Sequence, residues 1–262
     1  MKITGRVCVV TGAARGIGAA LAERFAAMGA KGVVCADLIP AEETARKVGG
    51  IAVRCDVSKE EDIRALVDTA VAKYGRVDIF CSNAGIISRH GLEATLDDWK
   101  RTIDVNLMAH IHAARVLVPL MLAQGSGHIV ATASAAGLLM QPDSATYTVT
   151  KHGAVAFAEW LSVNYGEQGI GVSCLCPQGV QTPMLLGPTG DRKSFLTEGS
   201  VTAEYAAQCV TDAIEADRFL VLPHPEVAEY ERRRAADRER WLGGMRRMLA
   251  RIKSDPAFRG LD

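Results

Sequence analysis

Short apolar runs alternate with helical segments along most of the chain. Six runs rich in Val, Ile, Cys and Ala are each followed by a turn and then, in most cases, by a helical pattern. They lie at 6–11, 32–37, 51–55, 77–82, 129–133 and 170–176. This alternation is typical of parallel strands joined by crossover helices. The sequence therefore predicts an α/β fold, with a doubly wound parallel sheet of about seven strands and helices on both faces.

Polar or glycine-rich residues follow the predicted strands. They are the glycine turn at 12–18, Asp37, Asp56, Asn83, Ser134 and Pro177. Because the carboxyl ends of parallel strands lie at one edge of the sheet, these residues are expected to converge there. Ligands of open α/β sheets bind beyond that edge. The order of the motifs therefore predicts one shared binding site.

The first strand leads into Thr11-Gly12-Ala-Ala-Arg15-Gly16-Ile17-Gly18, and a helical pattern follows. Between a strand and a helix, glycines let backbone N–H groups approach a pyrophosphate. The helix N-terminus adds partial positive charge at the same place. A turn with only a structural role is the alternative. The flanking elements favour a phosphate site formed by Gly12, Arg15, Gly16, Ile17 and Gly18.

Asp37 ends the second strand, about 20 residues past the glycine turn. A carboxylate at this position can accept hydrogen bonds from both hydroxyls of an adenosine ribose. It would also repel a 2′-phosphate. The sequence therefore predicts NAD as the cofactor, with NADP left open as a secondary one.

Tyr147 and Lys151 lie four residues apart in a segment expected to be helical. Pro142, Asp143 and Ser144 have the turn and capping character of a helix start. A spacing of four places both side chains on one helix face. The reference pKa of a tyrosine hydroxyl is about 10, and an adjacent cation favours its phenolate. A solvated face with a snorkelling lysine is the commoner use of this spacing, but the converging motifs favour a proton-transferring tyrosine.

Composition limits the remaining classes of function. The chain has 262 residues, 48% of them hydrophobic, and a formal net charge of zero, which disfavours general nucleic-acid binding. Seven scattered cysteines and a strand close behind Met1 favour a cytoplasmic protein with reduced thiols and no signal peptide. No apolar run reaches about 18 residues, so we expect no membrane span. The histidines form no ligand cluster, and we expect no metal site.

Taken together, these residues resemble the short-chain dehydrogenase/reductase family in its compact form, over roughly residues 4 to 222. Thr11-Gly12-x-x-x-Gly16-x-Gly18 is similar to the family's cofactor turn, and Asn83-Ala84-Gly85 to its motif after the fourth strand. The family's catalytic tetrad is matched by Asn106, Ser134, Tyr147 and Lys151. The resemblance implies a single-domain Rossmann fold and hydride transfer between a nicotinamide and a secondary alcohol or ketone.

The resemblance also implies a role for each matching residue. Tyr147 is expected to move the proton, Lys151 to hold the nicotinamide ribose and favour the phenolate, and Ser134 to orient the substrate oxygen. Asn106 is expected to hold a water in a proton relay, although a mid-helix Asn has poor propensity and can instead bend the helix. Cofactor contacts are implied for Asp56, Val57, Asn83, Ala84, Gly85, Tyr147, Lys151, Pro177, Val180 and Thr182.

Three positions depart from the family pattern. Ser82 stands where a second Asn is common, with little expected consequence. Gln178 follows Pro177 where the family usually has Gly, so this loop is expected to bend differently over the nicotinamide. Arg15 is a basic residue in the glycine turn, which often accompanies NADP. We give Asp37 more weight, because a carboxylate facing a phosphate is the larger penalty.

Residues 1–224 are expected to form the catalytic domain, and 225–262 a helical tail that packs on it or on a neighbouring subunit. The segment 184–200 is expected to cover a medium-sized apolar alcohol or ketone. The predicted helix at 96–121 and the Tyr147 helix have wide apolar stripes, which favour a homotetramer, with a dimer as the fallback. An epimerase or dehydratase of the same family and a non-catalytic dinucleotide sensor are the alternatives. The complete tetrad disfavours both.

Overall fold

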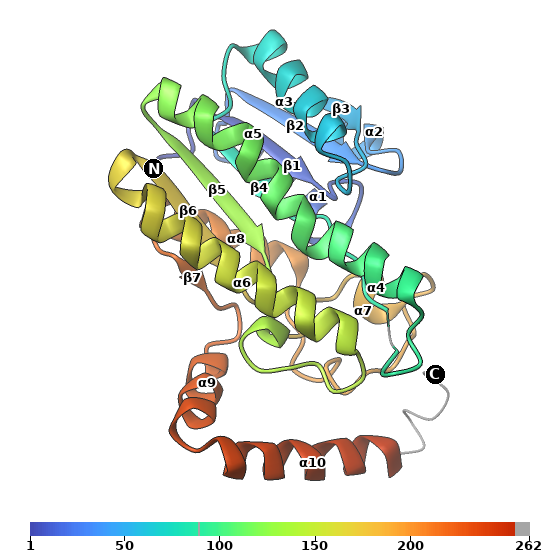
Figure 1. Ribbon diagram of the computed structural model, residues 1–262. Helices are drawn as coiled ribbons and strands as arrows, with labels where there is room; N and C mark the ends of the chain where they lie inside the picture. Colours follow the sequence, from blue (N-terminus) through green and yellow to red (C-terminus); the bar gives the residue numbers. More distant parts are fainter. Residues whose placement is uncertain (89, 255–262) are drawn as a thin grey trace.

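The computed structural model of the chain describes residues 1–88 and 90–254. Seven parallel strands form one sheet in the order β3-β2-β1-β4-β5-β6-β7 (Figure 1). The strands are β1 (Val7–Thr11), β2 (Gly32–Asp37), β3 (Ile51–Arg54), β4 (Ile79–Ser82), β5 (Gly127–Thr132), β6 (Ile170–Leu175) and β7 (Leu220–Val221). The strand order reverses between β1 and β4, which is where such sheets bind ligands. The predicted doubly wound α/β fold is confirmed.

Helices cover both faces of this sheet. One face packs against α3 (Glu60–Tyr74), α5 (Ala109–Gln124) and α6 (Ala145–Tyr165). The other packs against α1 (Gly16–Ala27), α2 (Glu42–Lys47) and α8 (Ala203–Glu215). Phe80 belongs to the first apolar core, whereas its strand neighbours Ile79 and Cys81 belong to the second. Burial on both faces explains why the strands appear in the sequence as continuous apolar runs.

The helix predicted at 96–121 contains a π-helical turn. α4 (Leu96–Ile103) ends in a π-helical turn, η1 (Asp104–Met108), and α5 then continues. A π turn takes one extra residue, so it shifts the direction of the side chains that follow. Asn106 lies in this turn with its side chain bonded to the backbone of Ile86. The predicted long helix is therefore present, with a π-helical turn at Asn106 inside it.

Among the residues that the structure describes, two helices follow β7. α9 (Glu226–Ala236) and α10 (Arg238–Ser254) form a C-terminal arm, residues 226–254, which lies below the main body in Figure 1. Residues 255–262 of the predicted tail lie outside the described residues. The remaining short helices are η2 (Ala135–Gly137), η3 (Gly166–Gln168) and α7 (Pro183–Leu186).

One described segment, Leu96–Gln124, is long and apolar enough to cross a membrane by length and composition, with a mean hydropathy of 1.4. It consists of α4, η1 and α5. Leu117 and Met121 of α5 are fully buried in the core beside the sheet. Core packing therefore accounts for the apolar character of this segment.

Candidate active site

The glycine turn packs closely against the end of β4. Gly12 has a φ of +67°, and a Cβ at this position would lie 2.9 Å from the Ala84 Cα. The Thr11 hydroxyl oxygen accepts hydrogen bonds from the backbone N–H groups of Asn83 at 2.9 Å and Ala84 at 3.1 Å. Any side chain at Gly12 would separate these two segments. The turn and the Asn83-Ala84-Gly85 motif are therefore one structural unit at the switch point of the sheet.

The other two glycines start α1. Gly16 is the first residue of the helix and has a φ of +60°, with Thr182 beside it. Gly18 is buried, and a Cβ there would overlap the Gly12 carbonyl oxygen. Gly18 thus allows the helix to approach the turn and does not face the ligand side. Arg15 is the exposed N-cap residue of α1.

Asp37 reaches back to the glycine turn from the end of β2. Its carboxylate accepts hydrogen bonds from the Ala14 N–H at 2.9 Å and the Ile39 N–H at 3.2 Å. These bonds hold the carboxylate at the cavity wall, beside the turn. Asp56 lies two residues after β3, and the Ser58 N–H and hydroxyl donate to it at 3.1 and 2.6 Å. Partial burial raises the pKa of Asp56, but these hydrogen bonds outweigh it and hold the pKa below its usual value.

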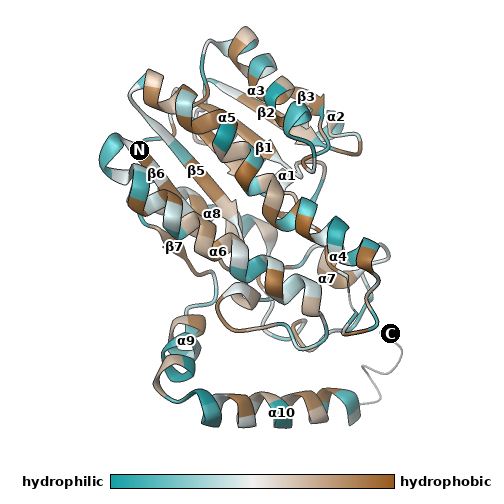
Figure 2. Cartoon of the chain, in the orientation of Figure 1, coloured by the Kyte–Doolittle hydropathy of each residue, from teal (hydrophilic) through white to brown (hydrophobic). Residues whose placement is uncertain are grey.

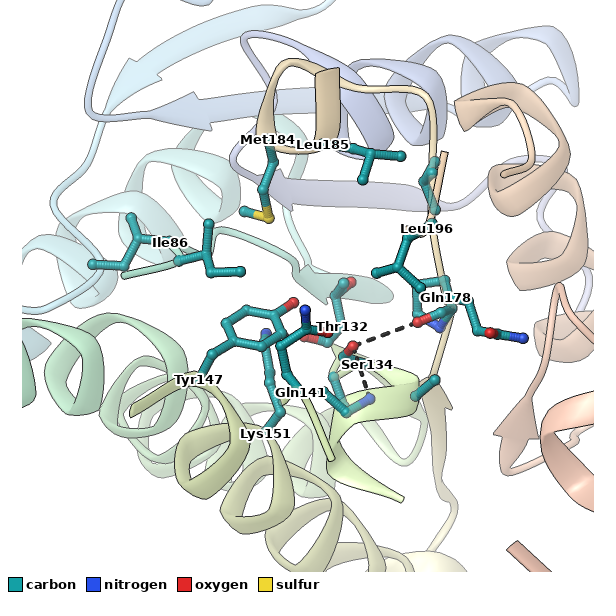
Figure 3. A pocket seen from close by; sticks show the side chains of 18 of the residues that line it. Ile86, Thr132, Ser134, Gln141, Tyr147, Lys151, Gln178, Met184, Leu185 and Leu196 are labelled. Carbon is teal, nitrogen blue, oxygen red and sulfur yellow. Dashed lines mark hydrogen bonds between the residues drawn. The ribbon is translucent and has the colours of Figure 1, made fainter. Parts of the chain in front are cut away.

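α6 positions Tyr147 and Lys151. The Ser144 hydroxyl caps the helix by accepting a hydrogen bond from the Tyr147 N–H at 3.2 Å, as the sequence predicted. The Lys151 Nζ lies 5.6 Å from the centre of the Tyr147 ring and donates to the Thr132 carbonyl at 2.7 Å. Lys151 is 2% exposed, and burial lowers its pKa from 10.5 to about 8. The ammonium is therefore fixed beside the phenol and away from bulk water (Figure 3).

Ser134 follows β5 on the same side of the cavity as Tyr147 (Figure 3). Its hydroxyl donates weakly to the Pro177 carbonyl at 3.4 Å and accepts from the Ala136 N–H at 3.1 Å. These contacts fix the hydroxyl at the junction of η2 and the loop after β6. A substrate oxygen between Ser134 and Tyr147 could exchange hydrogen bonds with both.

Asn106 lies behind this group and is fully buried. Its side-chain oxygen accepts from the Ile86 N–H at 2.9 Å, and its amide donates to the Ile86 carbonyl at 2.8 Å and the Thr150 hydroxyl at 3.3 Å. A Cβ on Gly85 would lie 3.4 Å from the Asn106 oxygen and 3.6 Å from the Lys151 Nζ. Asn106 therefore joins the π turn to the loop after β4, on the Lys151 side of the site.

One cavity of about 2040 Å³ brings most of the predicted residues together. It is lined by Gly12, Arg15, Gly16, Ile17, Asp37, Asp56, Val57, Asn83, Ala84, Gly85, Ser134, Tyr147, Lys151, Pro177, Val180 and Thr182. Gly18 and Asn106 do not line the cavity. Gly18 packs against Gly12, and Asn106 bonds to Ile86, and both of these residues line it. The convergence that the strand order predicted is therefore present in the structure.

The loop after β6 carries Gln178, the residue that departs from the family pattern. The Gln178 N–H donates to the His224 Nδ1 at 3.2 Å, and its side chain donates to Glu226 at 2.8 Å. Gly179 takes over the close approach, because a Cβ there would overlap the Leu196 carbonyl oxygen. The departure at Gln178 therefore ties this loop to the start of the C-terminal arm.

Sequence reasoning missed several supporting groups. The Thr132 hydroxyl donates to the Asn83 side chain at 3.1 Å, while its carbonyl holds Lys151. Thr11 and Ile86 act as described above. Thr11 and Thr132 are the last residues of their strands, a position that is a usable signal. Ile86 holds Asn106 through its backbone atoms, so its residue type carries no signal for this contact.

The cavity fits a dinucleotide. The glycine turn has no side chain that would block a pyrophosphate, and it lies at the N-terminus of α1. The Asp37 carboxylate and the Lys151 ammonium lie in the same cavity, at positions suited to ribose hydroxyls. Among the described residues, no group of three or more His, Cys, Asp or Glu side chains is arranged to hold a metal ion.

Comparison with known proteins agrees with this geometry. The family model described as short chain dehydrogenase matches residues 6–190. The chain belongs to the short-chain dehydrogenase family. This short-chain dehydrogenase is 38% identical over 237 residues to 1-deoxy-11-beta-hydroxypentalenate dehydrogenase of Streptomyces exfoliatus, covering 86% of each protein. It is 41% identical over 192 residues to the mitochondrial borneol dehydrogenase of Lavandula x intermedia, covering 70% of this chain and 72% of the relative.

A solved structure is similar over nearly the whole molecule. The short chain dehydrogenase/reductase of Burkholderia phymatum in complex with NAD superimposes with a TM-score of 0.83 at 32% identity, covering 91% of this chain and 96% of that one. The predicted family, fold and reaction class are thereby confirmed. This short-chain dehydrogenase is an oxidoreductase that uses a nicotinamide dinucleotide to interconvert hydroxyl and carbonyl groups.

Proposed function

We propose that the chain is an NAD-dependent dehydrogenase of apolar secondary alcohols, or the corresponding ketone reductase, with Tyr147 as the general acid and base. One observation carries the proposal. The Tyr147 ring lies 5.6 Å from a lysine ammonium that is buried and hydrogen-bonded to Thr132, inside the cavity that also holds the glycine turn. When bound, the nicotinamide supplies the redox chemistry, by accepting a hydride from the carbinol carbon or returning one to the carbonyl carbon.

The proton moves through Tyr147. In oxidation, the phenolate oxygen takes the hydroxyl proton of the alcohol as the carbinol carbon loses its hydride. In reduction, the phenol returns that proton to the developing alkoxide. The Lys151 ammonium stabilises the phenolate, because a cation in a dry site favours the charged form of its neighbour. Ser134 orients the substrate oxygen with a hydrogen bond, which keeps it within reach of Tyr147.

We assign Asn106 to the relay that restores the proton. Its side chain bonds to Ile86 and Thr150 and does not line the cavity, so it holds the π turn in place and does not touch the substrate. We propose that a water held near the π turn connects Lys151 to solvent. Asn106 is therefore a positioning residue for this relay.

NAD is the proposed cofactor, and the Asp37 carboxylate supports it. The carboxylate is held beside the glycine turn by the Ala14 N–H, and a 2′-phosphate would meet its negative charge. A similar protein has been crystallised with NAD. Arg15 is exposed nearby and forms no ion pair with any described residue, so dual use with NADP is the alternative.

The substrate class follows from the cavity and from relatives. The cavity portion beside Tyr147 is lined by Ile86, Met184, Leu185 and Leu196 (Figure 3). Relatives are named as dehydrogenases of borneol and of a hydroxypentalenate. We therefore propose a cyclic apolar alcohol or ketone. A complete tetrad disfavours a dinucleotide sensor, which has no need of Tyr147.

We further propose a cytoplasmic homo-oligomer, a tetramer or else a dimer, without nucleic-acid or membrane partners. All seven cysteines are free thiols, which supports a reducing compartment. We also propose that residues 1–224 form the catalytic domain and residues 225–262 a C-terminal tail. This division is supported by the position of β7, which ends at Val221, and of α9, which starts at Glu226.

Tyr147→Phe tests the proposed chemistry. The substitution removes only the hydroxyl, so turnover of a secondary alcohol should fall at least about a thousandfold, while NAD affinity stays within a few-fold. Turnover is followed at the nicotinamide absorbance and NAD binding by calorimetry. A variant that retained a tenth of the wild-type rate would show that another group moves the proton. Tyr165→Phe, at the other end of α6 and outside the cavity, is the matched control and should keep most of the activity.

A further inference from the structure

The C-terminal arm is attached to the body beside the active site. Val227 of α9 is fully buried. Arg234 of α9 donates from its Nη1 to the Leu138 carbonyl at 2.6 Å, and its Nη2 lies 3.2 Å from the His152 Nε2. Leu138 directly follows η2, and His152 directly follows Lys151. The arm is therefore anchored to the two segments that carry the catalytic side chains.

α10 presents an apolar face that the protein does not fully cover. Trp241, Leu242, Met245, Met248 and Leu249 are each partly buried, whereas most of the basic side chains of the helix are exposed. No residue of α10 is fully buried. The Tyr230 ring lies 6.4 Å from Trp241 and connects α10 to α9. The apolar face of α10 is thus oriented inward, toward a space that no protein side chain fills.

That space is continuous with the catalytic cavity. Trp241, Met245 and Met248 line the same cavity as Ser134 and Tyr147. Its volume of about 2040 Å³ exceeds the roughly 300–1,000 Å³ of ordinary ligand pockets. The part of the cavity beside the glycine turn and Asp37 would be filled by the dinucleotide. A large space therefore remains between Tyr147 and α10. Met184 and Leu196 line it on the body side, and the exposed Arg240 and Arg247 of α10 line it beside the apolar face.

We propose that α10 is the outer wall of the substrate site, and that its Trp241–Met245–Met248 face packs against the body of a bulky, multi-ring apolar alcohol or ketone. This inference rests on the proposed function and names the substrate class of that site. The reacting oxygen lies between Ser134 and Tyr147, and the rings extend toward the arm. Two methionines suit this wall, because their unbranched side chains adapt to irregular shapes. A small alcohol reaches Tyr147 without touching the arm.

The test compares two double variants of the full-length protein. Met245→Gln with Met248→Gln keeps side-chain length and helix propensity but places amides on the wall. Arg246→Gln with Arg251→Gln is the matched control, because both arginines are exposed and neither lines the cavity. The substrates are cyclohexanol and a tricyclic secondary alcohol. The wall variant should lose about tenfold or more in kcat/KM on the tricyclic alcohol, through KM, and less than twofold on cyclohexanol. The control variant should keep its kcat/KM on both alcohols.

A binding measurement separates this inference from the proposed activity. The tricyclic ketone is titrated calorimetrically into enzyme that holds oxidised NAD, a pairing that cannot react. Weaker binding in the wall variant alone supports the wall, even if no alcohol is turned over and the proposed activity fails. Equal losses on both substrates, unchanged binding of the ketone, or an equal effect in the control would overturn the inference. So would a fall in oligomer mass without any change in substrate selectivity, because a second copy would then cover this face.

Discussion

Single side chains in this protein are placed by backbone groups far away in the sequence. Lys151 is held by the Thr132 carbonyl, Asp37 by the Ala14 N–H, and Asn106 by both backbone groups of Ile86. A tyrosine–lysine pair at helical spacing is common in surface helices. Here burial removes the lysine from solvent, which makes the ammonium useful to its neighbour. Residue type and spacing predict the Tyr147–Lys151 pair. The burial of Lys151, which lets it stabilise a phenolate, is known only from the folded chain.

Asp37 should determine the choice between NAD and NADP. Asp37→Asn removes the negative charge and keeps an oxygen that can accept the hydrogen bond from Ala14. A unit charge near a phosphate is worth a few kcal/mol at short range, so kcat/KM with NADP should rise about tenfold or more relative to NAD. Steady-state rates with both cofactors on one alcohol provide the measurement. A wild-type preference for NADP would instead show that Arg15 outweighs Asp37.

His110 should make the protein sensitive to acid. It is buried on α5, neither ring nitrogen has a hydrogen-bond partner among the described residues, and burial lowers its pKa to about 3. In the unfolded chain its pKa is about 6.5, so the unfolded state binds more protons between pH 6.5 and 3. Stability is therefore lost as pH falls through this window, by about 2 kcal/mol at pH 5 from this group alone.

His110→Leu tests this effect. The variant fills a similar volume without a titratable group, so at pH 7 it should be as stable as the wild type or more stable. Between pH 7 and pH 5 it should lose about 2 kcal/mol less in free energy of unfolding, as measured by urea titration. His128 has a pKa lowered to about 4 by burial and is unchanged in the variant, so part of the acid sensitivity should remain. Parallel pH profiles would show that His110 does not titrate in this range.

At the scale of elements, the strands and their order of motifs were predictable, because burial on both faces leaves continuous apolar runs. The cap of α6 was predictable too, because Ser144 acts locally on the Tyr147 N–H. The π-helical turn at η1 was not predictable in its form. It depends on Ile86, which lies 20 residues before Asn106. The position of α10 beside the cavity was likewise not predictable from the sequence. The apolar stripe of the arm is visible in the sequence, but the surface that it faces is not.

The contact between η2 and α6 should be intolerant of added volume. A Cβ on Gly137 would overlap the Lys151 carbonyl and come within 2.8 Å of Val155. Gly137→Ala should therefore destabilise the protein by about 1–3 kcal/mol and reduce kcat/KM, because α6 has to shift with Lys151. Gly166→Ala, at the other end of α6, is the control. It has open space and helical backbone angles, so it should be neutral or stabilising by up to about 1 kcal/mol. Urea unfolding compares the two, and equal stabilities would disprove the close contact.

At the scale of the whole molecule, α5 and α6 lie side by side on one face of the sheet, with apolar turns on their outer side (Figure 2). On α6, Val149, Trp160 and Val163 are 53%, 52% and 81% exposed, and on α5 Leu122 is 37% exposed. Large apolar side chains exposed on neighbouring helices mark a candidate association site. A two-fold axis beside these helices would let each patch meet its own copy, which is the simplest closed interface.

We therefore expect a homotetramer with a mass of about 112 kDa, four times the 28.0 kDa of the chain, or else a dimer. Trp160→Lys with Val163→Lys places two charges where the outer face of α6 would be desolvated by a second copy, so the mass should fall to that of a smaller species. Leu92→Lys is the matched control, because Leu92 is 99% exposed and lies outside both helices. Light scattering at micromolar concentration measures all three proteins, with circular dichroism to check that each is folded. A wild-type mass near 28 kDa would rule out the oligomer, and the outer side chains of α6 would then be exposed in solution.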